Sequence, residues 1–257
     1  MSDWKPELYL KFEKQRTQPA IDLVSRIDMT APKRIIDIGC GPGNSTLALK
    51  KRWPNAQITG IDKSPNMIVQ ANKTDGDIHW VRADASGDLS SLGRFDVVFS
   101  NAAIQWMPHH EKLLPNLFSL LDSEGVLAVQ VPNTTQMPVH MTLQSLVHSE
   151  RWVAKLSGED THSTFFAPYY YDILSNMSND IDLWETHYYH VMENHQSIVQ
   201  WYSSTGLRPY LNRLVSASDQ TNFLVEFEDA LKAAYPKQKD GSVLFPFTRI
   251  FFIAIKH

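Results

Sequence analysis

The sequence of 257 residues lacks several features that would place it in a specialised class of proteins. Its one cysteine, Cys40, cannot form an internal disulfide, and no apolar signal segment follows Met1. No stretch approaches the roughly 20 apolar residues that a membrane span requires. We therefore expect a cytoplasmic protein with no membrane partner, in which Cys40 fills space rather than reacts.

The sequence also lacks an excess of positive charge. There are 24 lysines and arginines against 28 acidic residues, which gives a net charge of −4. A nucleic-acid interface requires a basic patch or stripe, so we predict no nucleic-acid partner. The histidines show only one weak pairing at metal-ligand spacing, Glu193 with His195, and we predict no metal.

The first half of the chain alternates short apolar runs with helical patterns. Strands are predicted at residues 34–38, 57–61, 78–81, 95–99 and 126–131, and helices at residues 45–52, 65–72 and 111–121. This alternation predicts an α/β fold, a Rossmann-like parallel sheet flanked by helices.

The alternation stops after Pro132. Helices are predicted at residues 141–156, 169–177, 195–202 and 218–235, with strands at 182–190 and 249–255. We expect edge strands of the same sheet and a helical cap over the strand ends, within one domain of residues 1–257. The cap insertions would lie within residues 133–246, and residues 1–30 would form an N-terminal helical lid.

Glycines cluster where the first predicted strand meets the first predicted helix. Gly39, Gly41 and Gly43 occupy this junction. Glycine lets the backbone turn tightly and approach a ligand, and the helix that follows presents free N–H groups. The pattern alone also suits a dinucleotide site or a plain connection.

Polar residues follow the next three predicted strands. Asp62 ends the second strand, about 20 residues past the loop, where a carboxylate can accept both hydroxyls of an adenosine ribose. Asp84 follows the third strand, where it could accept the adenine amino group, and Asn101 follows the fourth. The carboxyl ends of parallel strands meet at one edge, so these residues are expected to line one ligand site.

Asp37, directly before the loop, distinguishes between two cofactors. Its negative charge would repel a pyrophosphate but could attract the ammonium of a methionine moiety. This favours S-adenosylmethionine (SAM) as the cofactor. A nicotinamide-dependent dehydrogenase remains an alternative that cofactor binding would decide.

These motifs resemble those of class I SAM-dependent methyltransferases, through residues 36–43, 60–64 and 83–84. More narrowly, the chain is similar to the trans-aconitate 2-methyltransferase family in residues 9–13, 16–20, 101–110, 128–133, 205–211 and 247–255. The resemblance implies a class I methyltransferase sheet and methyl transfer from SAM to one carboxylate of trans-aconitate. His109 and His110 depart from the family pattern, which has an acidic residue before a histidine.

The resemblance also implies roles in cofactor binding. Asp62 would hold the ribose, Asp84 the adenine amine, and Gly39, Gly41 and Asn101 the methionine end. The full predicted set is Arg16, Asp37, Gly39, Gly41, Asn44, Asp62, Lys63, Met67, Asp84, Ala85 and Asn101. Arg16 lies on a helical segment that could close over the cofactor and meet the methionine carboxylate.

A carboxylate substrate sets the demands on the site. A carboxyl group with a pKa near 4 is already ionised at neutral pH, so we predict no general acid or base. Carboxylates that do not react need cations, and Arg208 and Arg249 are the candidates because a guanidinium binds a carboxylate in two places. Either arginine could instead pair with a structural acid. Tyr9 and Trp106 are predicted to line the substrate site.

Two other functions remain open. The first is a methyltransferase of the same fold that acts on another small acid, a phenol or an amine. The second is a regulatory protein that binds SAM without catalysis. In each case we expect a monomer or a weak homodimer.

Overall fold

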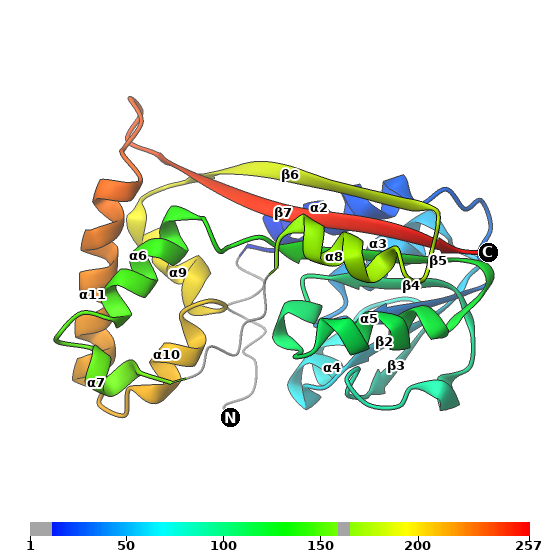
Figure 1. The fold of residues 1–257 in the computed structure, drawn as a ribbon. Helices are drawn as coiled ribbons and strands as arrows, with labels where there is room; N and C mark the ends of the chain where they lie inside the picture. Colours follow the sequence, from blue (N-terminus) through cyan, green and yellow to red (C-terminus); the bar gives the residue numbers. More distant parts are fainter. Residues whose placement is uncertain (1–11, 159–164) are drawn as a thin grey trace.

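The computed structural model describes residues 12–158 and 165–257 and contains one mixed sheet of seven strands (Figure 1). The strands are β1 (Arg34–Ile38), β2 (Gln57–Asp62), β3 (Ile78–Arg82), β4 (Phe95–Asn101), β5 (Leu121–Pro132), β6 (Ile181–Met192) and β7 (Val243–Lys256). Their order is β3-β2-β1-β4-β5-β7-β6, and β7 runs antiparallel to both of its neighbours. The predicted Rossmann-like α/β fold is confirmed.

Helices cover both faces of this sheet because its central strands are apolar on both sides. Helices α2 (Glu13–Arg26) and α3 (Asn44–Arg52) pack on the face that carries Ile35, Phe99 and Phe251, here called the α2–α3 face. Helices α5 (His110–Ser119) and α8 (Ala167–Leu174) pack on the opposite face. Helix α4 (Pro65–Ala71) lies against β2 and β3.

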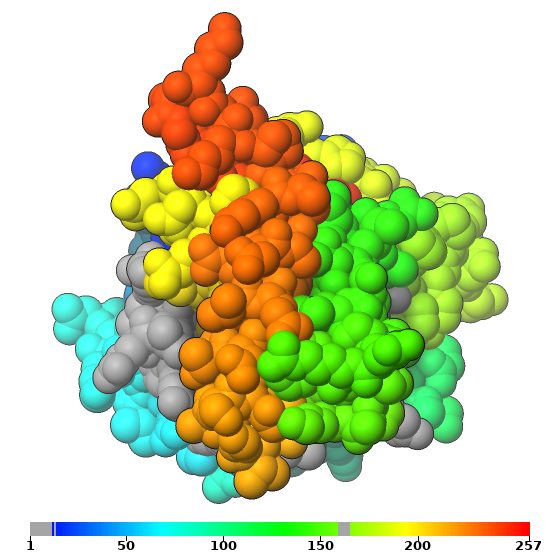
Figure 2. Space-filling view, turned by 90° about the vertical axis from the view of Figure 1, so that its left-hand side faces the viewer, coloured from blue at the N-terminus to red at the C-terminus, as the bar shows by residue number. Residues whose placement is uncertain are grey.

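The remaining helices form a cap with a hydrophobic core of its own. They are α6 (Pro138–Val147), α7 (Val153–Leu156), α9 (His195–Ser203), α10 (Arg208–Arg213) and α11 (Ala217–Ala234). Figure 2 shows α11, in orange, on the outer surface of the cap beside α6, in green. No helix in the described part of the chain is both long and apolar enough to cross a membrane.

The long antiparallel pair β6 and β7 joins the cap to the sheet (Figure 1). Phe245 and Phe247 of β7 pack in the core of the cap, whereas Phe251 and Phe252 pack on the two faces of the sheet. The predicted last strand, at residues 249–255, was therefore too short. Its amino-terminal half is as regular as the rest, but its aromatic side chains belong to the cap.

The predicted helix at residues 141–156 is wrong. The chain forms α6, a turn, and then the short α7. Trp152 is fully buried at this turn, and its indole N–H donates to Glu226 of α11 at 2.7 Å. Its ring also packs against Phe223 in a T-shaped arrangement. Contacts with α11 thus override the helical pattern of the local sequence.

Candidate active site

The junction of β1 and α3 is a tight glycine loop. Gly39, Gly41 and Gly43 have φ values of 71°, 56° and 103°, in the left-handed region that favours glycine. A Cβ on Gly39 would lie 2.3 Å from the Cβ of Ala103, so the loop touches the segment that follows β4. A Cβ on Gly41 would meet no atom of residues 12–158 or 165–257 within 4 Å. The loop therefore turns one open side outward, as close backbone approach to a ligand requires.

Asp62, at the carboxyl end of β2, lies directly against this loop. One carboxylate oxygen accepts the N–H of Gly41 at 3.0 Å, and the other accepts the N–H of Ser64 at 2.8 Å. Ser64 in turn caps α4 by accepting the N–H of Met67, whose side chain is buried. The structure therefore brings together the predicted residues Gly41, Asp62 and Met67.

Asp84, beyond β3, forms an ion pair with Lys63, which follows β2. Their charged atoms are 2.6 Å apart, and both side chains are exposed, Lys63 more than Asp84. The Lys63 contact is the main cause of a lowered pKa at Asp84, helped by the N–H of Ser86. Asp84 is thus an ionised acceptor beside the end of β2, and Ala85, which follows Asp84, is buried.

Asp37 is fully buried at the end of β1, on the α2–α3 face. One oxygen, Oδ2, accepts the hydroxyls of Ser45 and Thr46 in the first turns of α3, at 2.7 and 2.6 Å. The other oxygen, Oδ1, has no hydrogen-bond partner in the described residues. Burial raises the pKa of this carboxyl to about 6. Asp37 thus fixes the start of α3, near the half-buried Asn44, and keeps one acceptor for a donor such as an ammonium.

The segment after β4 carries Trp106, and the side chain of His110 fixes its conformation. The buried His110 ring donates from Nε2 to the carbonyl of Ile104 at 2.8 Å, which leaves Nδ1 to accept the hydroxyl of Tyr170 at 3.2 Å. Burial lowers the pKa of His110, so its ring is neutral. His110 therefore has a structural role in fixing the turn at Trp106, while His109 is exposed beside Glu111.

A buried polar row crosses β4, β5 and β7 on the α2–α3 face. Asn101 pairs in register with Gln130, and Arg249 pairs with Pro132, two residues further along β5. Arg249 is 4% exposed, and its Nη1 donates to Oε1 of Gln130 at 3.1 Å. Gln130 was not predicted as a site residue. Its only signal in the sequence is an amide inside an otherwise apolar strand.

The cap lies against the same region through α9. Arg16 of α2 is buried and donates from Nη2 to the Ser204 hydroxyl at 2.7 Å, beside the end of α9. His190 of β6 stacks on Trp201 of α9 with ring centroids 4.9 Å apart. Burial and the charge of Arg249 lower the pKa of His190 to about 4.

The predicted substrate residues do not all lie in one place. Arg249 belongs to the buried polar row, and Trp106 is half-buried after β4. Arg208 begins α10 in the cap and is half-buried there. Tyr9 lies outside the described residues, as does the rest of the predicted lid up to residue 11.

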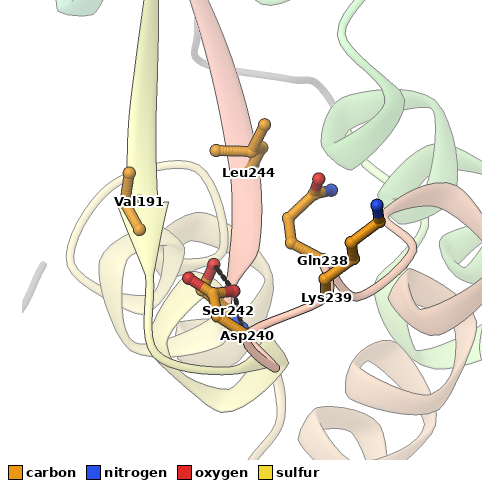
Figure 3. A pocket seen from close by; sticks show the side chains of 6 residues that line it. All are labelled: Val191, Gln238, Lys239, Asp240, Ser242 and Leu244. Atoms are coloured by element: carbon orange, nitrogen blue, oxygen red, sulfur yellow. Dashed lines mark hydrogen bonds between the residues drawn. The ribbon is translucent and has the colours of Figure 1, made fainter.

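A separate surface hollow lies in the cap where β6 ends and β7 begins (Figure 3). It is lined by Val191, Gln238, Lys239, Asp240, Ser242 and Leu244, and it shares no residue with the glycine loop or the polar row. In residues 12–158 and 165–257 no three histidine, cysteine or acidic side chains gather as metal ligands would.

The sheet and its loop are those of a known class of enzymes. A family model for a methyltransferase domain matches residues 35–125. The solved structure of the YcgJ protein of Bacillus subtilis aligns with a TM-score of 0.60 at 15% identity, over 93% of this chain and 99% of that one. The plantazolicin methyltransferase BpumL, solved with a triazolic desmethylPZN analog and S-adenosylhomocysteine (SAH), aligns with a TM-score of 0.56 at 18% identity, over 98% of this chain and 91% of that one. The chain therefore has the fold of class I SAM-dependent methyltransferases.

Full-length relatives narrow the class to a family. The trans-aconitate 2-methyltransferase of Escherichia coli (strain K12 / DH10B) is 41% identical over 254 residues, which cover 99% of this chain and 98% of that protein. The enzyme of Escherichia coli O157:H7 is 42% identical over the same length. The chain belongs to the trans-aconitate 2-methyltransferase family.

Proposed function

We propose that this enzyme transfers the methyl group of SAM to one carboxylate of trans-aconitate, giving a monomethyl ester and SAH. The observation that carries the proposal is the 41% identity over 99% of the chain, which extends through the cap as well as the cofactor loop. A carboxylate oxygen forms a bond to the methyl carbon while the bond from carbon to sulfur breaks. The sulfonium thereby becomes a neutral thioether.

The residues at the carboxyl edge of the sheet have the chemistry to hold SAM. Asp62 would accept the ribose hydroxyls and Asp84 the adenine amine, while Asp37 and Asn101 would accept the ammonium. The unpartnered Oδ1 of Asp37 and the open space at Gly41 support this fit. We propose that the other predicted residues, Arg16, Gly39, Asn44, Lys63, Met67 and Ala85, complete the cofactor site.

The reaction requires positioning rather than proton transfer. SAM, when bound, supplies an electrophilic methyl group, and the substrate carboxylate is already ionised. The protein must align the two groups at roughly 3 Å and keep water away from the nucleophile. We therefore assign no residue as a general acid or base. The cap would exclude water.

Carboxylates that do not react would be held by arginine. Arg249 is the stronger candidate because it is buried in the polar row, and Arg208 would contribute from the cap. Trp106 and Tyr9 would line the same site. The reacting carboxylate should lie away from either guanidinium, because a close cation would weaken the nucleophile.

The localisation, oligomeric state and partners of the enzyme are also proposals. We propose a cytoplasmic monomer or weak homodimer of one domain, residues 1–257, with neither nucleic acid nor a membrane as partner. The net charge of −4 supports the absence of a nucleic-acid partner.

A panel of acceptors tests this proposal. Label from methyl-labelled SAM would be followed into trans-aconitate, cis-aconitate, isocitrate, citrate and a simple phenol. We expect kcat/KM for trans-aconitate to exceed that for the other acids by about 10-fold or more. An acid of another shape places one of its carboxylates away from the group that should bind it, and this loss costs binding energy. The product should lose its label in mild base, as an ester does. Preferred labelling of the phenol, or SAM binding without transfer to any acid, would overturn the assignment.

A further inference from the structure

The side chain of Gln130 is fully buried next to Arg249, and its amide NH₂ group can donate hydrogen bonds to an anion. We propose that Gln130 is a specificity-determining residue, which donates from Nε2 to a carboxylate of the substrate that does not react, while Arg249 supplies the positive charge. The inference rests on the proposed function, because it assumes that the acceptor is a polycarboxylate.

Arg249 determines which way the Gln130 amide points. A guanidinium can only donate hydrogen bonds, so the amide oxygen of Gln130 must face Nη1 of Arg249, at 3.1 Å. The amide NH₂ group then points away from Arg249. This Nε2 atom is buried and has no hydrogen-bond partner within the described residues. A buried donor left unpaired is costly, which indicates that a ligand supplies the acceptor.

The neighbouring strand indicates where the two ligands meet. Asn101 of β4 lies opposite Gln130, and its Oδ1 is also buried without a partner in the described part of the chain. Asn101 therefore offers an acceptor, which suits the ammonium of SAM, whereas Gln130 offers a donor, which suits a carboxylate. Along the polar row, the residue on β4 would therefore face the cofactor and the residue on β5 would face the substrate.

The surroundings of Arg249 favour an anion over a second cation. Its guanidinium lies over the ring of Phe247, 4.7 Å from the centroid, and 6.0 Å from that of Tyr188. These rings limit access of water and so strengthen the attraction between Arg249 and a carboxylate. His190, the titratable side chain on β6 nearest the cap, is neutral at pH 7 because its pKa lies near 4. Arg249 thus provides positive charge at this point of β7.

The test compares three substitutions of the pair with a matched control. Gln130→Met removes the amide at similar volume, Gln130→Glu keeps the oxygen that faces Arg249 but replaces the donor with a second acceptor, and Arg249→Lys keeps the charge without the planar fork. Gln57→Met, at the exposed start of β2, is the control. Steady-state kinetics with trans-aconitate and calorimetry with SAH are measured for each.

We expect Gln130→Met to raise KM for trans-aconitate by about 10-fold to 100-fold with little change in kcat or in the Kd of SAH. Gln130→Glu should be worse, because its carboxylate repels the substrate. A purely structural residue would behave in the opposite way, since glutamate pairs well with Arg249. Wild-type KM in Gln130→Glu would overturn the inference and leave the proposed function intact.

A second measurement covers variants that fail to fold. The side-chain amide of Gln130 in ¹⁵N-labelled wild-type protein, saturated with SAH, should shift on addition of trans-aconitate. An unchanged amide signal at saturating acid would contradict the inference. Absence of methyl transfer to any acid by the wild type would instead sink the proposed function, and this inference with it.

Discussion

At the scale of single residues, Asp37 has an observed role in the fold and a proposed role in the cofactor site. It is fully buried, and its Oδ2 holds Ser45 and Thr46 at the start of α3. A carboxyl whose pKa is higher in the folded chain than in the unfolded chain binds its proton more tightly when folded. The contribution of Asp37 to stability therefore falls as pH rises from about 4 to about 6. A bound ammonium would recover part of this cost.

The variant Asp37→Asn tests this account. Relative to the variant, the wild type without cofactor should lose about 1 to 2 kcal/mol of stability between pH 5 and pH 8, because only the wild type ionises a buried group. SAM should bind the variant about 10-fold more weakly at pH 8, since the ammonium loses its charged partner. Urea unfolding across this pH range and calorimetry with SAM are the measurements. Equal SAM affinity in the two proteins would show that Asp37 serves the fold alone.

At the scale of elements, the strand-to-helix loop was well predicted from the sequence, because glycine spacing and apolar periodicity are local signals. The strands of the parallel half of the sheet were also found for this reason. The helix predicted at residues 141–156 failed because burial of Trp152 against α11 ends α6 early. The length of β7 was missed because its first residues pack in the cap rather than on the sheet.

Alanine variants of two glycines distinguish the cost of backbone strain from the loss of ligand binding. Gly41 and Gly241 have φ values of 56° and 86°, and a Cβ on either would meet no atom of the described residues within 4 Å. Substitution by alanine should cost each about 1 kcal/mol of stability. Only Gly41→Ala should also weaken SAH binding, by about 10-fold or more, because its Cβ enters the space for the ligand. Thermal unfolding and SAH calorimetry compare them, and equal SAH affinity in the two variants would place the ligand elsewhere.

At the scale of the whole molecule, the candidate site lies where the sheet meets the cap. A cap over the strand ends was expected from the sequence, but the pairs of residues that meet there could not be predicted. Arg249 and Gln130 are 119 positions apart, and Arg16 reaches Ser204 over 188 positions. Each pair meets only through the order of strands and the docking of α9. Arg249 was predicted because it is a charge in an apolar run. Gln130 was missed because its contact with Arg249 is seen only once β5 and β7 are placed side by side in the structure.

The most direct test of methyl transfer to trans-aconitate uses SAM with a ¹³C-labelled methyl group. The full-length wild-type enzyme, SAM and trans-aconitate would be followed together by NMR. We predict that the sulfonium methyl signal decays as one ester methyl signal grows, with one equivalent of SAH formed, and that mild base removes the new signal. Decay of the sulfonium signal at the same rate with and without the acid, and with no ester methyl signal, would contradict the account.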